Sequence, residues 1–182
     1  MKFHSDKHHR RSIRLPHYDY VQPGAYFVTI CTKNRVCLLG DIVDEKIRLS
    51  DQGTITLRCW TEIAQHFSGV ETDAFVVMPN HVHGILTINP HSVGAETMGA
   101  RTAPLLGRMV AYFKYQSTTC INELCKRPAV PVWQRNYYEH VIRNEEELNS
   151  IRQYIIDNPK QWELDRENPA NVWTTSRSPL VC

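Results

Sequence analysis

Two histidines stand one residue apart in the stretch VVMPNHVHGIL, which runs from residue 76 to residue 86 and reads as a β-strand. Side chains alternate between the two faces of a strand, so His81 and His83 must point to the same face. Residues i and i+2 lie about 6.5–7 Å apart, which lets both imidazoles converge on one ion. Two ligands rarely complete a metal site, so a third donor is expected from elsewhere in the chain. The alternative is a pair of structural histidines, because histidine is tolerated at partly buried positions.

A second pair of candidate residues lies on the last helix that the sequence predicts. Tyr154 and Asn158 are related as i and i+4, so they lie on one side of the helix, about 6 Å apart along its axis. Both lie on the flank of the apolar stripe, where docking of the helix would present them at the edge of a sheet. Asn158 could supply a carbonyl oxygen to the ion and Tyr154 a phenol next to it. The alternative is that Tyr154 widens the stripe and Asn158 caps the helix before Pro159.

The composition is that of an ordinary globular protein. The 182 residues are 42% hydrophobic and 22% charged, with a net charge of +2, which is enough for one domain with a sizeable core. No apolar run approaches the roughly 18 residues of a membrane span, and the N-terminal segment lacks the apolar region of a secretion signal. The six cysteines form no C-x-x-C pair, which predicts reduced thiols in a cytoplasmic protein.

Basic residues gather near the start of the chain, where residues 2–14 hold five Lys or Arg against a single Asp. Such an arm is typical of a phosphate-binding segment, with Arg10, Arg11 and Arg14 as candidate DNA-binding residues. A solvated tail is equally compatible with the charge alone. Periodicity is lost after Trp162. The chain therefore divides into a basic N-terminal arm, a single domain and a C-terminal tail, over residues 1–23, 24–162 and 163–182.

The hydrophobic pattern predicts the elements that must position these residues. Strands are expected over 24–32, 71–79, about 80–88 and 132–142, and helices over 52–68, 104–124 and from the N-cap Asn144 to Pro159. Residues 91–102 read as a surface loop. The order β-α-β-β-α-β-α indicates an α+β fold with a ferredoxin-like (RRM-like) antiparallel sheet, helices on one face and an open active-site face. The two histidines would sit on the open face, with Val76, Val82 and Leu86 on the core face.

Several short motifs together resemble one family. MPNHVHG, VWQRNYYEHVIRNEEEL and YIIDNP, with the opening RRSIRLPHYDYVQPGAYFVTICTKNR, are similar to the single-tyrosine HUH transposases. Within that superfamily, the chain most resembles the REP-associated tyrosine transposases, relatives of the transposases of small insertion sequences. The resemblance covers roughly residues 10–162.

The resemblance implies a role for each candidate residue. His81, His83 and Asn158 would be ligands of a divalent metal, Mg²⁺ or Mn²⁺, and Tyr154 would be the nucleophile. The ion would polarise a phosphodiester oxygen while the tyrosine attacks phosphorus, which leaves a 5′-phosphotyrosine and a free 3′-OH. The implied partner is single-stranded DNA that carries hairpins and a short guide sequence, bound by a monomer or a homodimer.

Basic and aromatic residues outside this set are expected to contact the DNA. Trp133 could stack on an unpaired base, and the cations would hold phosphates, although Trp133 is equally compatible with the core. Tyr115 is the strongest rival to Tyr154 because it is helical and lies beside a lysine, but Thr119 stands where a partner amide would be needed. The candidate DNA-binding residues of the domain are Arg108, Lys114, Trp133 and Arg135.

Three readings from other classes remain open. An RNA-recognition module shares the expected sheet, but it has no need of two histidines with a tyrosine and an amide nearby. A domesticated protein could bind repetitive hairpin elements with little or no strand transfer, although the four candidate residues are intact. A metal-dependent hydrolase would use water as the nucleophile, and a trapped covalent protein–DNA adduct would exclude it.

Overall fold

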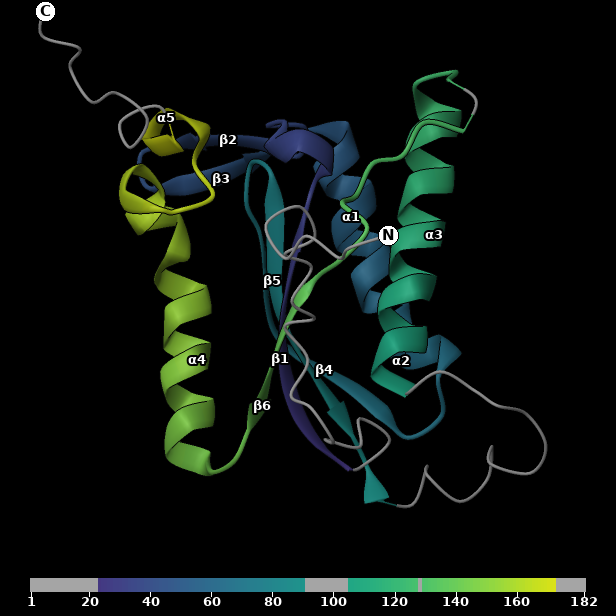
Figure 1. The fold of residues 1–182 in the computed structure, drawn as a ribbon, viewed down its shortest axis with the longest axis vertical. Helices are drawn as coiled ribbons and strands as arrows, with labels where there is room; N and C mark the ends of the chain where they lie inside the picture. Colours follow the sequence, from purple (N-terminus) through teal and green to yellow (C-terminus); the bar gives the residue numbers. More distant parts are fainter. Residues whose placement is uncertain (1–22, 91–104, 128, 173–182) are drawn as a thin grey trace, which may run out of the picture.

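A computed structural model describes residues 23–90, 105–127 and 129–172 of the chain. The basic arm with Arg10, Arg11 and Arg14 and the expected loop over 91–102 lie outside these residues. At the centre is one antiparallel sheet of four strands in the order β4-β5-β1-β6 (Figure 1). The sheet confirms the predicted α+β class. None of the helices in the described residues has the length and hydropathy needed to cross a membrane.

The two central strands position the histidines. β1 (Gly24–Cys31) and β5 (His81–Ile88) pair along their full length, with Cys31 opposite His81 and Thr29 opposite His83. β4 (Val70–Val77) flanks β5, and β6 (Tyr138–Ile142) flanks β1. Each crossover helix therefore joins two strands that are separated by a third, the split β-α-β arrangement.

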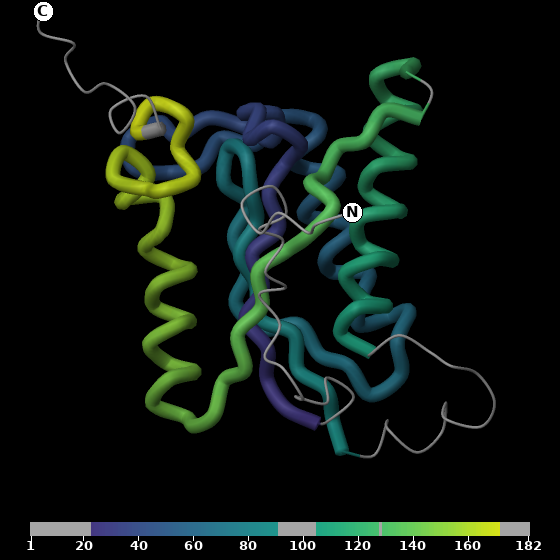
Figure 2. The backbone as a smooth tube through the Cα atoms, viewed as in Figure 1, coloured from purple at the N-terminus to yellow at the C-terminus, as the bar shows by residue number. Residues whose placement is uncertain are grey.

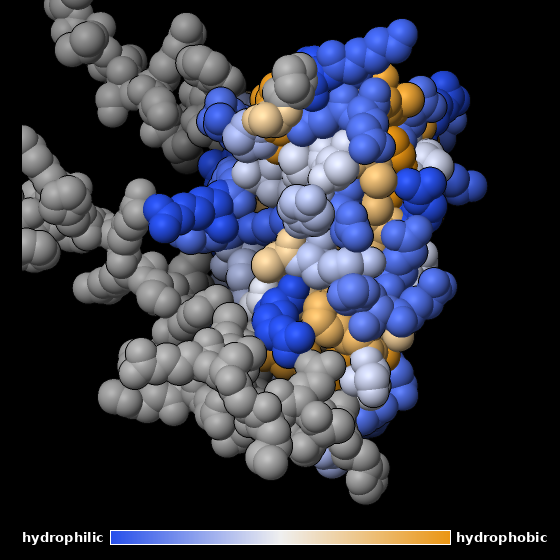
Figure 3. All heavy atoms as spheres, turned by 90° about the vertical axis from the view of Figure 1, so that its right-hand side faces the viewer, coloured by the Kyte–Doolittle hydropathy of each residue, from blue (hydrophilic) through white to orange (hydrophobic). Residues whose placement is uncertain are grey.

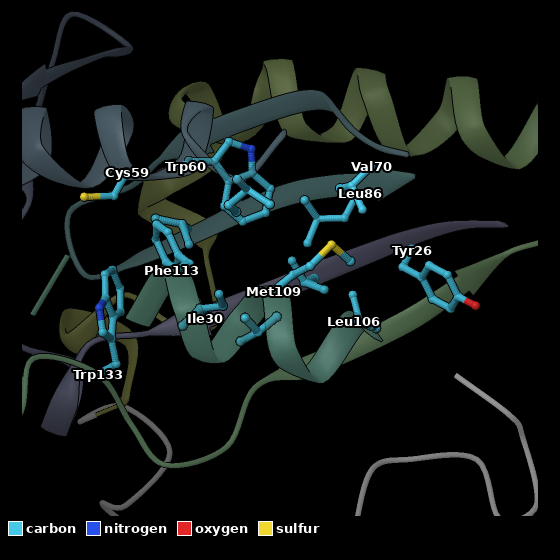
Figure 4. Close-up of a cluster of buried hydrophobic side chains, with 14 of the residues drawn as sticks. Tyr26, Ile30, Cys59, Trp60, Val70, Leu86, Leu106, Met109, Phe113 and Trp133 are labelled. Carbon is cyan, nitrogen blue, oxygen red and sulfur yellow. The ribbon is translucent and has the colours of Figure 1, made fainter. Parts of the chain in front are cut away.

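One face of the sheet carries the main hydrophobic core. α1 (Asp51–Thr61), α2 (Ile63–His66) and α3 (Leu105–Leu124) lie on this face (Figure 1), where Trp60, Phe113 and other large side chains meet those of β1 and β5 (Figure 4). The outward surface on the α3 side is mostly hydrophilic, with scattered hydrophobic residues (Figure 3).

Gly84 is required on this core face. A Cβ at Gly84 would lie 2.3 Å from the Trp60 ring, which is itself stacked on Phe75 with ring centroids 4.3 Å apart. The core face includes Val82 and Leu86, as the alternation predicts. Val76 packs instead with the cluster on the opposite face, because β4 and β5 are separate strands and Val76 pairs with His83, whose face it shares.

The expectation of helices on one face only is wrong. α4 (Glu145–Asp157) lies on the other side of the sheet from α1, α2 and α3 (Figure 1) and packs its Ile155 on Phe27, Ile85 and Ile142. Its N-cap is Asn144, as predicted, and the Asn144 side chain accepts a hydrogen bond from the Glu147 N–H. The apolar stripe of α4 needs a surface to cover, and this second sheet face provides it. The histidines on this face are therefore buried.

Smaller elements differ from the sequence prediction. The predicted helix over 52–68 divides into α1 and α2 at Glu62. β2 (Gly40–Val43) and β3 (Lys46–Leu49) form an unpredicted hairpin whose turn residues Asp44 and Glu45 have φ of 50° and 60°. Two positive φ angles are typical of a type I′ turn, and Asp-Glu is not a recognised sequence signal for it. The short helices are η2 (Lys33–Arg35), η4 (Asn158–Leu164) and α5 (Pro169–Val172).

The strand predicted over 132–142 forms only in its second half. Trp133 makes an isolated bridge with Thr32, and the chain enters β6 at Tyr138. Between them, the Lys114 ammonium donates hydrogen bonds to the backbone carbonyls of Gln134, Arg135 and Asn136, at 2.9, 3.3 and 3.1 Å. Those carbonyls are engaged by a side chain and are not part of a strand ladder.

Candidate metal centre and tyrosine

His81 and His83 lie side by side on β5 with their outer nitrogens facing each other. His81 is 0% exposed and His83 is 4% exposed, and their Nε2 atoms are 3.0 Å apart. Two imidazole nitrogens this close share either a proton or a cation, because two lone pairs at that distance repel each other. Both rings lie on one face of β5 and meet there, as the alternation of side chains along a strand predicts.

Each histidine is oriented by a hydrogen bond at its other nitrogen. His81 Nδ1 lies 2.9 Å from Asn80 Oδ1, and since a carboxamide oxygen only accepts, the proton of His81 is assigned to Nδ1. His83 Nδ1 lies 2.8 Å from the Thr29 hydroxyl, which can accept in the same way. With both protons at Nδ1, both Nε2 atoms offer lone pairs, which is the arrangement of metal-binding histidines.

Burial keeps both imidazoles neutral. Desolvation lowers the pKa of His81 well below its ordinary value, and the neighbouring charges of His83 and Arg35 lower it further. Desolvation lowers the pKa of His83 to about 3. Neither ring is therefore protonated near neutral pH, and both can act as ligands.

Tyr154 and Asn158 come to the histidines from α4 and from the first residue of η4. The Tyr154 hydroxyl lies 3.4 Å from His83 Nε2, and the side chain is 44% exposed. Asn158 is 2% exposed, and among the described residues its Oδ1 atom has no hydrogen-bond partner. A buried carboxamide oxygen without a partner is costly, and a cation beside it would remove that cost.

The ordinary state of the Tyr154 phenol is protonated. Burial raises its pKa, and the nearby Asp165 and Glu167 carboxylates raise it further, while the Asn158 hydrogen bond and the Arg166 charge lower it. The Tyr154 ring packs edge-to-face on Phe27, with centroids 6.0 Å apart, so a ring contact between α4 and β1 orients the side chain.

A further candidate ligand, in addition to the two histidines and Asn158, comes from a segment that sequence reasoning assigned to the tail. Asp165 Oδ2 lies 3.7 Å from His81 Nε2, and one ligand atom each from His81, His83 and Asp165 lie within 4.8 Å of one another. These three residues could hold a metal. A sequence signal for this segment exists in Asn168-Pro169, because Asn is a favoured N-cap and Pro a favoured first helical residue. Figure 2 shows residues 158–172 beyond the end of α4, next to the β2–β3 hairpin.

A cleft of about 730 Å³ lies between α4 and the sheet, and Thr29 and Tyr154, which both contact His83, are among its lining residues. Tyr154 and Asn158 line it together with Tyr138, Arg166 and Asp165. Tyr138 is thus a second tyrosine in the cleft. Tyr115, the rival expected from sequence, is 70% exposed and lines a separate groove along α3.

The four candidate DNA-binding residues of the domain do not line this cleft. Lys114 uses its ammonium to hold the three backbone carbonyls named above, and burial lowers its pKa to about 8. Trp133 is 6% exposed, and its indole N–H donates to Ser117 in the core, so the structure favours the core alternative. Arg108 lies over the Phe67 ring at 5.8 Å. Arg135 is exposed on the α3 groove.

Two bacterial proteins are similar to this chain in sequence, although no family model matches it. An uncharacterized protein of Haemophilus influenzae is 40% identical over 175 residues, which cover 91% of this chain and 96% of that protein. A second protein of that bacterium, provisionally named a REP-associated tyrosine transposase, is 24% identical over 149 residues, covering 78% and 73%.

A solved structure gives the same indication for the fold. The structure of a REP-associated tyrosine transposase bound to a REP hairpin has a TM-score of 0.57 and 21% identity, covering 81% of this chain and 73% of that one. The chain is thus similar to REP-associated tyrosine transposases in both sequence and fold. The sequence prediction of the family is confirmed. This similarity makes the cleft, with its tyrosine and the paired imidazoles beside it, the candidate active site.

Proposed function

We propose that the chain is a single-stranded DNA transposase that cleaves and rejoins hairpin-bearing DNA through a 5′-phosphotyrosine on Tyr154. One observation carries the proposal. The Tyr154 hydroxyl lies 3.4 Å from the Nε2 atom of a paired, neutral histidine, one helical turn from the unpartnered buried oxygen of Asn158. A nucleophile, a nitrogen pair and a free oxygen donor thus meet at one end of one cleft.

The donor set fits a divalent ion. His81 and His83 would bind through Nε2 and Asn158 through Oδ1, and a cation would give the buried Asn158 oxygen the partner that it lacks among the described residues. Magnesium prefers oxygen ligands, so a site with two imidazoles also suits manganese. When bound, the ion would polarise a non-bridging phosphate oxygen and offset negative charge in the transition state.

Tyr154 would carry out the covalent step. Its phenolic oxygen forms a bond to phosphorus, and the bond from phosphorus to the 3′ oxygen of the preceding nucleotide breaks. The phenol loses its proton in this step and the departing 3′ oxygen gains one, so the products are a 5′-phosphotyrosine and a free 3′-OH. The phosphodiester energy is kept in the tyrosyl ester, and attack by another 3′-OH reverses the step and joins strands.

DNA would enter along surfaces that carry positive charge. Arg166 lines the cleft, and Arg135 lines the α3 groove. We assign phosphate contacts to these two and to the basic arm with Arg10, Arg11 and Arg14, and a weaker contact to Arg108. Lys114 and Trp133 would act indirectly, by holding residues 132–136 in place. The REP hairpin bound to the solved relative supports hairpin DNA as the substrate class.

The test is the change Tyr154→Phe, assayed on hairpin oligonucleotides from the chain's own genomic neighbourhood. The ring contact with Phe27 survives the change, so stability should fall by only about 1 kcal/mol and DNA binding should persist. Cleavage should fall by at least about a thousandfold, because no other oxygen occupies that position. Peptide mapping should find the nucleotide on the segment Gln153-Tyr154-Ile155.

Two matched changes serve as controls. Tyr138→Phe removes a hydroxyl from the same cleft and Tyr115→Phe removes one from the α3 groove, and both variants should keep substantial activity. An adduct on Tyr138 or Tyr115 would disprove the assignment. Hairpin binding by the unmodified chain with no cleavage in Mg²⁺ or Mn²⁺ would favour the alternative of a domesticated DNA-binding protein.

A further inference from the structure

We propose that Asp165 is a fourth ligand of the metal centre, and that an ion pair between Arg35 and Glu167 is the latch that positions it. The inference rests on the proposed function only in that the ion is the one held by His81 and His83. It adds to the site a segment, residues 165–168, that lies beyond the sequence motifs on which the resemblance to the family was based.

The two oxygens of Asp165 have different partners. Oδ1 accepts a hydrogen bond from the Glu167 backbone N–H at 2.7 Å, which closes a turn and fixes the carboxylate. Oδ2 is left facing His81 Nε2 at 3.7 Å. The first oxygen thus builds the turn and the second is directed at the histidines.

Among the residues that the structure describes, no lysine or arginine forms an ion pair with Asp165, although the charge of the neighbouring Arg166 acts on it at longer range. The Asp165 side chain is 9% exposed, and within the described residues His81 is the one basic group within ion-pair distance of it. The Nε2 atoms of the two imidazoles lie 3.0 Å apart, and within the described part of the chain the neighbouring Asn158 oxygen has no hydrogen-bond partner. A buried carboxylate beside three other electron-pair donors is costly unless a cation lies among them. A divalent ion bound by two nitrogens and two oxygens would pair all four.

The turn is anchored to the rest of the domain through Glu167. The Arg35 guanidinium donates two hydrogen bonds to the Glu167 carboxylate, from Nε and Nη2. Arg35 has φ of 55°, which is rare for a residue with a Cβ and indicates that its backbone is held by the contacts around it. Such a paired contact restrains the turn in two directions.

Asn80 links the latch to the histidines. Its Nδ2 donates to the Glu167 carbonyl at 2.6 Å and to the Arg35 carbonyl at 3.1 Å, while its Oδ1 accepts from His81. One fully buried carboxamide therefore orients a ligand and holds both partners of the ion pair. Displacement of the turn would disturb His81 as well as Asp165.

The experiment is a titration of the purified full chain with Mn²⁺. Binding is measured by calorimetry and, independently, by the electron paramagnetic resonance signal of the free ion. Asp165→Asn should weaken Mn²⁺ binding by at least about tenfold, because one anionic ligand is lost. Glu167→Gln should weaken it by about tenfold through loss of positioning. Arg35→Gln should do the same, and the double variant should be no worse than either single one.

Asp157→Asn is the matched control, because Asp157 lies at the end of α4, bonds to Lys160 and does not line the cleft. Its Mn²⁺ affinity should equal that of the unmodified chain. Unchanged affinity in Asp165→Asn would overturn the fourth ligand, and unchanged affinity in Glu167→Gln would overturn the latch. His81→Ala separates the two proposals: if it also binds Mn²⁺ normally, the metal centre itself is wrong, whereas its loss of binding leaves only the role of Asp165 in question.

Discussion

The two faces of the sheet are built from the same strands but differ in the side chains that they bury. The face covered by α1 and α3 is a continuous apolar cluster built around Trp60 and Phe113. Among the described residues, the buried apolar cluster on the face covered by α4 has four members, and it lies beside the paired histidines, the Asn158 oxygen and the cleft. Burial of polar groups costs free energy, and a native domain is only marginally stable. The apolar packing on the first face must therefore offset the cost of burying polar groups on the second.

The comparison predicts that truncation is more damaging on the first face. Phe113→Ala should lower the free energy of unfolding by about 3–5 kcal/mol, since a fully buried ring is lost from the large cluster. Ile155→Ala on α4 should cost about 2 kcal/mol, because its small cluster adjoins a cleft into which the site can relax. Chemical denaturation of both variants measures the difference.

Hydrogen exchange would sharpen this result. In Ile155→Ala, the amides of α4 should lose protection while those of β5 keep it, because α4 can open without unfolding the sheet. A loss of protection in β5 as large as that in α4, or an unfolding cost equal to that of Phe113→Ala, would show that the two faces form one cooperative unit.

The second prediction concerns a change that affects the site and spares the fold. Thr29→Val removes the hydroxyl that orients His83, so Mn²⁺ affinity should fall by about 10–100-fold. The free energy of unfolding should change by only about 1–2 kcal/mol, the cost of one unpaired buried polar group. Thr29→Ser keeps the hydroxyl and should restore the affinity, so weak binding by the serine variant would contradict the orienting role.

The smallest expected effect is a dependence on pH. Arg152 on α4 hydrogen-bonds to Asp73 on β4 and lowers the pKa of that carboxyl below its ordinary 3.8. A lowered pKa in the folded state means that the pair stabilises the protein above pH 3.8, and that this stabilisation is lost as the pH falls through the folded pKa. The effect is small because both side chains are partly exposed.

The measurement is the difference in unfolding free energy between the unmodified chain and Asp73→Asn, taken from pH 7 down to pH 3. The unmodified chain should be the more stable at pH 7, and the gap should close in the acid range. If the difference in unfolding free energy stays constant across this range, the Arg152–Asp73 pair does not stabilise the packing of α4 on the sheet.

Local patterns made half of the site predictable from sequence. His81 and His83 share a face because strands alternate, and the distance between Tyr154 and Asn158 follows from one helical turn. The N-cap at Asn144 has a local chemical signal of the same kind. These features depend on residues close in the sequence, where periodicity is decisive.

The rest depends on contacts between distant segments. Three such contacts have no local sequence pattern. α4 covers the histidine face, Lys114 binds the carbonyls of residues 134–136, and Asp165 lies next to His81. The β2–β3 hairpin was missed because its turn has an unusual sequence. Burial of the histidines was missed for the same reason as the position of α4.

The alternation along β5 has a consequence for how this chain can evolve. His81, Val82, His83 and Gly84 serve opposite faces in turn, and the strand is paired on both of its edges. Insertion or deletion of a single residue here would send the imidazoles into the aromatic core and apolar side chains into the cleft. Substitutions in the strand can be tested one at a time by selection, but its length cannot drift, so any lineage that keeps this chemistry must also keep this spacing.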